Sequence, residues 1–304
     1  MTSTRPHVLP HVTPRVPTPR APRPPAAGHR LSRPVRAADE LPCVAVYAPS
    51  GSTPSRDRAK ALARAAFSRR RAHLIVVRTA ADLAAAFHTD LIDASLLDLA
   101  GGSDDAWRAA RLAREFPSAA FFAVTPLRAA DAATVARCAE LEFADVIVEG
   151  IDDGVARDLV TPATFRARFA AALHEPPPAL SLTTPLQRAA WHCIVAHGGL
   201  PVRTDVVAAA VGVTREHLSR AFATGDAPNV KRVIDLVRLV AAAELAKNPG
   251  YDIRDVAVVL RFASASHLST TAQRVVGMRP TSLARLRAVD LVERFSMGRG
   301  RSRG

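Results

Sequence analysis

The chain has 304 residues, a formal net charge of +13 at pH 7 and 48% apolar residues. This length and apolar content exclude a single very small domain and a chain that is disordered throughout, and they predict about two globular domains. No window approaches the ~18 apolar residues of a membrane span, and the N-terminus lacks the apolar segment of a secretory signal. We therefore expect a cytoplasmic protein without membrane contact.

The charge is distributed unevenly along the chain. The first 38 residues hold seven arginines and no acidic residue, the C-terminal third is also basic, and the middle is mildly acidic. A polyanionic partner is therefore expected to meet the C-terminal third and the two tails. The three cysteines are far apart and lack metal-binding spacing, which indicates a reducing compartment and no metal site.

Residues 1–40 are rich in proline and arginine and predict a disordered arm. From 41 to 174, short apolar runs alternate with helical patterns, which predicts a parallel α/β domain. We expect strands at 43–48, 73–78, 94–100, 119–125 and 144–150. We expect helices at 56–67, 81–88, 105–116 and 129–141, and a fifth from an N-cap at Thr161 through Leu173, with Pro162 at its first position.

Residues 175–185 contain three consecutive prolines and predict an interdomain linker. The β signals then stop, and residues 186–295 predict an all-helical domain, followed by a basic disordered tail at 296–304. We expect helices at 186–197, 203–210, 214–223, 228–246, 252–260, 265–275 and 281–295.

Two segments of the helical domain share one pattern. Residues 204–223 combine a short apolar helix, a turn at Gly212, an N-cap at Thr214 and a second helix. Residues 252–276 repeat this design with an N-cap at Ser264. Each pattern is typical of a helix-turn-helix, and the duplication across one long helix in a basic region predicts a pair of such units.

These residues resemble the DNA-binding domain of the AraC/XylS family of transcription regulators over residues 186 to about 287. The first unit carries the resemblance through Val211, Gly212, Val213, Thr214, His217, Leu218, Ser219, Arg220 and Phe222, followed by Arg238, Leu239, Ala242 and Leu245. The second carries it through Val256, Ala257, Phe262, Ser264, Ser266, His267, Leu268, Arg274, Gly277 and Pro280. The resemblance implies that one chain reads two major-groove segments about one helical turn, ~34 Å, apart.

The resemblance also implies which side chains meet DNA. The groove-facing positions are Glu216, Ser219 and Arg220 in the first unit, and Ala265, Ser266, His267, Ser269 and Thr270 in the second. Independently of the resemblance, we expect phosphate contacts from Thr214, Arg215, Arg232, Ser264, Gln273, Arg274 and Arg279, with a solvated surface as the alternative role of Arg215, Arg232, Gln273, Arg274 and Arg279. Arg220 can pair with guanine and Glu216 with cytosine, so we expect the first unit to carry more sequence specificity. Packing is the alternative role for His217 and His267.

The second unit departs from the family pattern at three positions. Arg261 stands where the family usually has glycine, which would cost ~1 kcal/mol or more if the backbone there needs a positive φ. Thr270 replaces a usual arginine, and Ala272 replaces a usual core phenylalanine. We therefore expect the second unit to be looser.

The middle domain resembles a response-regulator receiver, with a flavodoxin-like five-stranded parallel sheet, in its layout. Asp98 ends the third strand and Thr125 the fourth. Ala48-Pro49-Ser50 stands where receivers place an acidic pair, and Glu149 where they place a lysine. Because these departures remove both requirements of phosphoryl transfer, we expect a pseudo-receiver that is not phosphorylated. Phosphorylation of Asp98 is one alternative, and an anion bound by the small-residue loop 50–56 is another.

We expect a transcription regulator and not an enzyme, with no cofactor. Its expected partners are duplex DNA, RNA polymerase and a second copy of the chain through the middle domain. Two alternatives remain open: a phospho-dependent response regulator that uses Asp98, and a protein-interaction adaptor that has lost DNA binding. The arm at 1–40 and the end at 299–304 would add phosphate contacts.

Overall fold

The structure is a computed structural model that describes residues 41–49, 58–67, 71–126, 128, 131–152 and 154–300, with the backbone alone at 299 and 300. The predicted arm at 1–40, the predicted anion-binding loop at 50–56 and the end of the predicted tail at 301–304 lie outside these residues.

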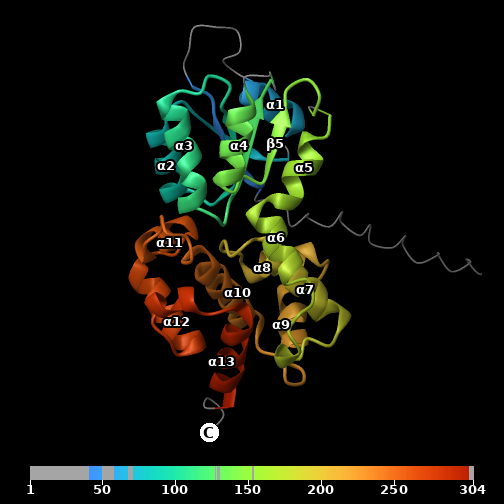
Figure 1. Cartoon of the computed structure of the whole chain (residues 1–304). Helices are drawn as coiled ribbons and strands as arrows, with labels where there is room; N and C mark the ends of the chain where they lie inside the picture. The colour runs from blue at the N-terminus through green and yellow to red at the C-terminus, as the bar shows by residue number, and fades with distance from the viewer. Residues whose placement is uncertain are drawn as a thin grey trace, which may run out of the picture. The chain divides into compact units, whose positions relative to one another are not determined.

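A five-stranded parallel sheet forms the centre of the α/β domain (Figure 1). Its strands are β1 (Cys43–Tyr47), β2 (His73–Val77), β3 (Ile92–Asp98), β4 (Ala120–Thr125) and β5 (Asp145–Val148), in the order β2-β1-β3-β4-β5. This order is that of flavodoxin-like folds. The strands are short apolar runs because both faces of a parallel sheet are buried. The predicted fold class of this domain is confirmed.

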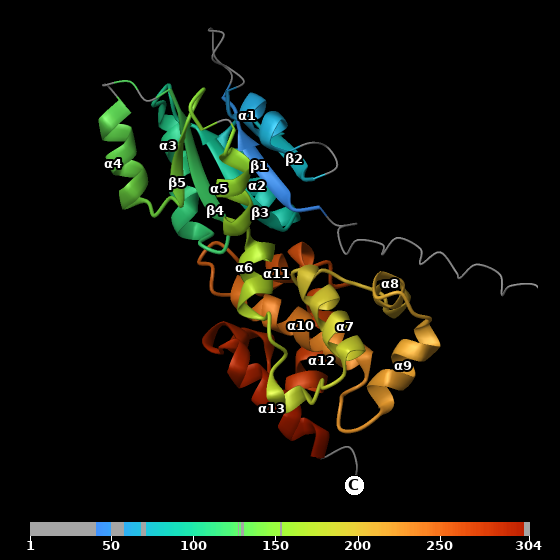
Figure 2. The same cartoon turned by 90° about the vertical axis from the view of Figure 1, so that its right-hand side faces the viewer.

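Helices cover both faces of the sheet, as Figure 2 shows. One face carries α1 (Arg58–Ala66) and α5 (Ala156–Ala163), packed on strand residues such as Val44 and Val46. The other carries α2 (Ala80–Thr89), α3 (Asp104–Glu115) and α4 (Ala132–Glu140), packed on residues such as Ala45 and Tyr47. Alternate residues of β1 thus belong to two separate hydrophobic cores, because successive side chains of a strand point to opposite faces.

The predicted helix that begins at Thr161 is wrong. Pro162 lies inside α5, and a second helix, α6 (Phe165–Ala172), starts after Thr164. Thr164 has an extended ψ of 148° and its Oγ1 accepts a hydrogen bond from the Ala167 N–H, so it is the true N-cap. The apolar side chains of α6, Phe165 and Phe169, belong to the core of the helical domain.

The helical domain contains α7 (Pro185–Ala196), α8 (Thr204–Ala210), α9 (Arg215–Ala223), α10 (Val230–Leu245), α11 (Ile253–Val259) and α12 (Ala265–Val276), close to the predicted spans. The predicted helix 281–295 is instead a 3-10 helix, η5 (Pro280–Arg285), and a separate α13 (Ala288–Gly300), which runs into the predicted tail. The predicted linker contains η4 (Pro178–Leu180), and its Leu180 and Leu182 are buried. None of the helices in the described ranges is long and apolar enough to cross a membrane.

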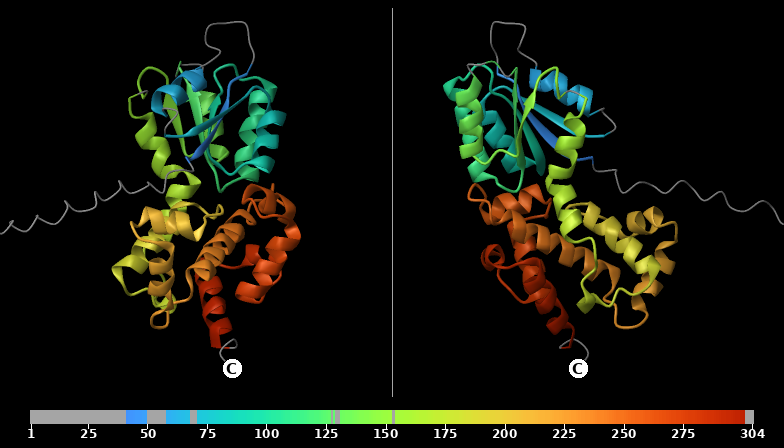
Figure 3. Two further views of the ribbon diagram at one scale, coloured as in Figure 1. Left: turned by 180° about the vertical axis from the view of Figure 1, so that it is seen from behind. Right: turned by 45° about the vertical axis from the view of Figure 1, so that its right-hand side comes forward.

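Helix α10 is the centre of the helical domain. Asn229 caps its start by accepting a hydrogen bond from the Arg232 N–H, and 13 of its 16 residues are buried. It packs against α7, α9, α11, α12 and α13. Figure 3 shows α10 between the segments that carry α9 and α12, so one rigid helix holds the two repeated segments.

The end of α10 joins the α/β domain through residues 115–118 and 248–251, which we call the Asn248 junction. The Gly250 N–H donates to the Glu115 carbonyl at 2.9 Å. Asn248 accepts from the Ser118 N–H and donates to the Ser118 Oγ, both at 2.9 Å. A Cβ at Gly250 would lie 2.6 Å from the Phe116 ring, so only glycine permits this approach.

Two side-chain contacts extend the Asn248 junction. The Tyr251 ring lies 4.9 Å from that of Phe116, and His88 Nδ1 on α2 lies 3.1 Å from Asp255 Oδ1 on α11. The α/β domain is therefore attached to the start of the second repeated segment.

Candidate nucleic-acid interface

The first repeated unit is a helix-turn-helix built from α8 and α9. The turn contains Gly212 at φ +75°, and the Val213 N–H donates to the Ala208 carbonyl at 3.0 Å, which closes the end of α8. Thr214 Oγ1 accepts from the His217 N–H at 3.1 Å, so the predicted N-cap of α9 is confirmed. Leu218 and Phe222 are buried, which leaves the opposite side of α9 exposed.

The second unit repeats this construction with α11 and α12. Arg261 has a φ of +52°, and the Phe262 N–H donates to the Ala257 carbonyl at 2.8 Å. Ser264 Oγ accepts from the His267 N–H at 3.0 Å, as predicted for the N-cap of α12. The backbone at Arg261 thus has the left-handed conformation for which glycine is the least costly residue.

The side chains predicted to contact bases lie along the two second helices. Glu216, Ser219 and Arg220 are exposed on α9; on α12, Ser266, His267 and Thr270 are exposed, and Ala265 and Ser269 are half-buried. Two of the α12 side chains have partners within their own unit. The Thr270 hydroxyl donates to the Ser266 carbonyl at 3.0 Å, and His267 Nδ1 accepts from the Ala263 N–H at 3.4 Å while its ring lies edge-on to Phe262.

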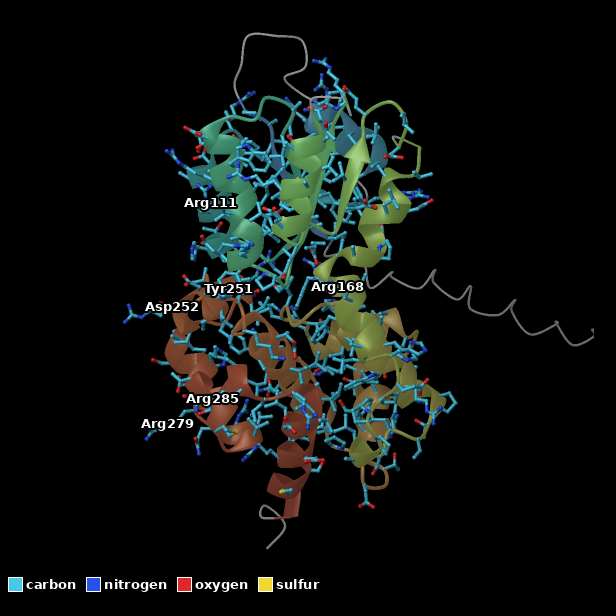
Figure 4. The ribbon with its side chains drawn as sticks, viewed as in Figure 1. Arg111, Arg168, Tyr251, Asp252, Arg279 and Arg285 are labelled. Carbon is cyan, nitrogen blue, oxygen red and sulfur yellow. The ribbon has the colours of Figure 1, made fainter. Side chains whose placement is uncertain are left out.

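The predicted phosphate contacts fall into two groups. Arg215, Gln273 and Arg279 are exposed, and Figure 4 shows Arg279 at the outer edge of the domain. Three other predicted phosphate contacts also have structural roles. Thr214 and Ser264 cap helices, and the Arg232 guanidinium lies 5.0 Å from the centre of the Phe295 ring.

Arg274 on α12 has a structural partner on the central helix. Its Nη2 donates to Oδ2 of Asp235, a buried residue of α10, at 2.8 Å. This ion pair holds α12 against α10, although the Arg274 side chain is itself 56% exposed.

Sequence reasoning missed two basic residues beside the first unit. Arg203 and Lys231 line a cleft of about 330 Å³, together with Arg215 and the carboxylates Asp205 and Asp235. Arg203 is the N-cap residue of α8, and Lys231 lies in the first turn of α10. A phosphate is favoured near helix N-termini, so basic residues directly at predicted helix starts are the signal that could have identified them.

One buried arginine contacts both the second unit and the loop that precedes the first. The Arg238 guanidinium on α10 donates to the carbonyls of Gly199 at 3.3 Å and Leu260 at 2.9 Å, and it lies 3.8 Å from the centre of the Phe262 ring. It also donates to the carbonyl of Arg261 at 3.4 Å. Burial lowers the pKa of Arg238 from its ordinary value. Arg238 therefore holds the turn of the second unit against α10 and the loop before α8.

The receiver-like end of the sheet has its own ion pair. Asp98 is buried and its Oδ1 accepts from the Ala100 N–H at 3.1 Å. Burial raises the pKa of Asp98 and Glu149 raises it further, while the Ala100 hydrogen bond and Arg58 act in the opposite direction. Glu149, at the position where receivers have lysine, pairs with Arg58 on α1. Thr125 donates to Asp131 at 3.0 Å.

The comparison with known families places both units in one domain. Residues 207–285 match the model of a family described as a helix-turn-helix domain. The match runs from α8 into η5 and supports an AraC-type DNA-binding domain and a role in transcription regulation. No curated protein and no solved structure matches the chain.

Proposed function

We propose that this protein regulates transcription by placing α9 and α12 in two adjacent major-groove segments of one DNA duplex. The observation that carries the proposal is the repetition itself. Both units have the same capped second helix and the same closing bond at the end of the first, and both pack on α10. Two recognition helices fixed on one rigid helix suit a site whose two major-groove segments lie about one helical turn, ~34 Å, apart.

The two units contact DNA in different ways. Arg220 and Glu216 project from α9 and can form hydrogen bonds with guanine and cytosine edges, each worth about 1–3 kcal/mol of discrimination. On α12, His267 and Thr270 have partners within the unit, so this helix positions the protein chiefly through phosphates. Arg203, Arg215 and Lys231 supply further cationic charge beside the first unit.

The α/β domain acts as an input domain that is not phosphorylated. Glu149 stands where a receiver needs a cation to offset the phosphoryl charge, and it pairs with Arg58. Regulators of the matched type are not normally enzymes, and we assign no catalysis to this chain. Dimerisation through the α/β domain and contact with RNA polymerase remain parts of the proposal.

The test is DNA binding by the full chain across a salt series. Sites are first selected from genomic DNA, and fluorescence anisotropy then compares wild type with Arg220→Ala, with Arg111→Ala on the exposed side of α3 as the matched control. We expect log K to fall linearly with log salt, and Arg220→Ala to weaken binding to a selected site by about 5- to 150-fold relative to random duplex. Absence of salt-dependent binding would favour the adaptor alternative.

A second measurement addresses Asp98. Incubation with acetyl phosphate and Mg²⁺ should leave the intact mass of the protein unchanged, and Asp98→Asn should bind the selected duplex as wild type does. A gain of one phosphoryl group that is lost in Asp98→Asn would show a phospho-dependent regulator instead.

A further inference from the structure

A cavity of about 380 Å³ lies where the α/β domain meets the helical domain. Its walls come from the loop between α3 and β4, from α6, from the end of α10 and from the start of α13. Pockets that bind small molecules commonly lie at domain interfaces and are mainly apolar with a few polar groups. Two features of this cavity, its floor and its rim, indicate which class of ligand fits it.

The floor of the cavity is apolar and partly aromatic. Phe165 and Phe169 of α6 line it, with ring centres 5.6 Å apart and ring planes at 27°. Leu173 and Val240 add buried aliphatic surface. An apolar body, including an aromatic ring, would find favourable contacts here.

The rim of the cavity carries two cations and one carboxylate. Arg168 of α6 donates to the Ser118 carbonyl, and Figure 4 shows this arginine between the two domains. Lys247 Nζ pairs with Glu244 Oε1 at 2.6 Å. A guanidinium has five N–H donors, so Arg168 can also bind a ligand carboxylate while it holds Ser118.

We propose that this cavity binds a small organic acid with an apolar body, whose carboxylate is held by Arg168. The charge of the rim favours an anion because the lysine already neutralises the single glutamate. The ligand would contact Ser118 and Asn248, the two sides of the Asn248 junction. Its binding would thereby affect how the α/β domain is attached to the second helix-turn-helix unit. This inference goes beyond the proposed function, and its test requires no DNA, so the two can fail independently.

The experiment is isothermal titration of the full chain with three probes that share one apolar body: 4-phenylbutyrate, 4-phenyl-1-butanol and 4-phenylbutylamine. Arg168→Gln removes the proposed carboxylate partner. Ala172→Phe, at an exposed position on the cavity wall, fills the space. Arg111→Gln, an exposed arginine on α3, is the matched control. Circular dichroism confirms that each variant is folded, and Ala172→Leu replaces Ala172→Phe if needed.

We expect the acid to bind about tenfold more tightly than the alcohol, as one charge-assisted hydrogen bond implies, and the amine to bind more weakly than either. Arg168→Gln should remove the preference for the acid but leave alcohol binding unchanged. Ala172→Phe should weaken both, and Arg111→Gln neither. Equal affinity for the three probes, no saturable binding of the acid, or acid binding that survives Ala172→Phe would overturn the proposal.

Discussion

The two helix-turn-helix units have the same plan but differ at the turn and in the second helix. In the first, three residues, 211–213, separate α8 from the N-cap, and the left-handed position is Gly212. In the second, four residues, 260–263, separate α11 from the N-cap, and the left-handed position is Arg261. At the position 50 residues after the buried Phe222 of α9, α12 has the buried Ala272.

The two units also differ in the side chains that they expose and in the parts of the chain that they contact. The first unit has an unstrained turn, a large core side chain and exposed Glu216 and Arg220, which suit base reading. The second accepts a strained backbone, and its turn contacts Arg238 while α11 contacts the α/β domain. Under the proposed function, the first unit carries most of the base reading, and the second also joins the helical domain to the α/β domain.

The largest loss of stability should follow from a substitution in the core of the first unit. Phe222→Ala removes a ring that is 1% exposed, and we expect a loss of about 3–5 kcal/mol of unfolding free energy. Ala272→Gly, at the corresponding position of α12, should cost about 2 kcal/mol, because glycine has a lower helix propensity and a buried methyl group is lost. Urea unfolding followed by circular dichroism measures both. Equal losses would show that the Phe222 ring contributes no more to stability than the methyl group of Ala272.

Arg238→Met should cause the second largest loss of unfolding free energy. The change keeps apolar bulk beside Phe262 but leaves the carbonyls of Gly199 and Leu260 without their donor, and we expect a loss of about 3 kcal/mol. The control is Arg285→Met, an exposed arginine of η5, which should change stability by about 0.5 kcal/mol or less. Hydrogen exchange should show faster opening of the turn at 260–263 in Arg238→Met alone.

Most elements of the fold could be predicted because their signals are local. The strands are apolar runs, and the caps Thr214 and Ser264 are recognisable from residue type and position. The break between α5 and α6 was missed because Thr161-Pro162 imitates a helix start, whereas the true cap, Thr164, is recognisable only from its extended backbone. Pro280 similarly starts a 3-10 helix rather than the predicted long one.

The contacts that organise the candidate site could not be predicted from the sequence. Arg238 meets Gly199 across 39 residues, and Arg274 meets Asp235 across the same separation. Such pairs depend on how helices pack, which local patterns do not specify. The positive φ at Arg261 is a partial exception, because the family's usual glycine at that position indicated it in advance.

Thr270 of α12 lies 50 residues after Arg220 of α9, at the corresponding position of the second unit. Thr270→Arg places a cation on the exposed side of α12. Because each added phosphate contact releases about one counterion, the slope of log K against log salt should steepen by about 0.9. Thr270→Met, which adds length without charge, should leave the slope unchanged. An unaltered slope for Thr270→Arg would show that this position does not face the duplex.

The smallest expected effect concerns the free-energy cost of the left-handed backbone at Arg261. Arg261→Gly should relieve the left-handed backbone and raise the unfolding free energy by about 1 kcal/mol. Gly212→Ala makes the opposite change in the first unit, where a Cβ would meet no atom within 4 Å, so backbone strain alone should cost about 1 kcal/mol.

The two changes in urea unfolding should therefore be nearly equal and opposite. The Arg261 side chain lines a cleft with Asp90 of the α/β domain. A net loss of stability in Arg261→Gly would mean that this side chain contributes more by holding the two domains together than its backbone costs. In that case the strained turn adds a contact between the α/β domain and the second unit to those of the Asn248 junction.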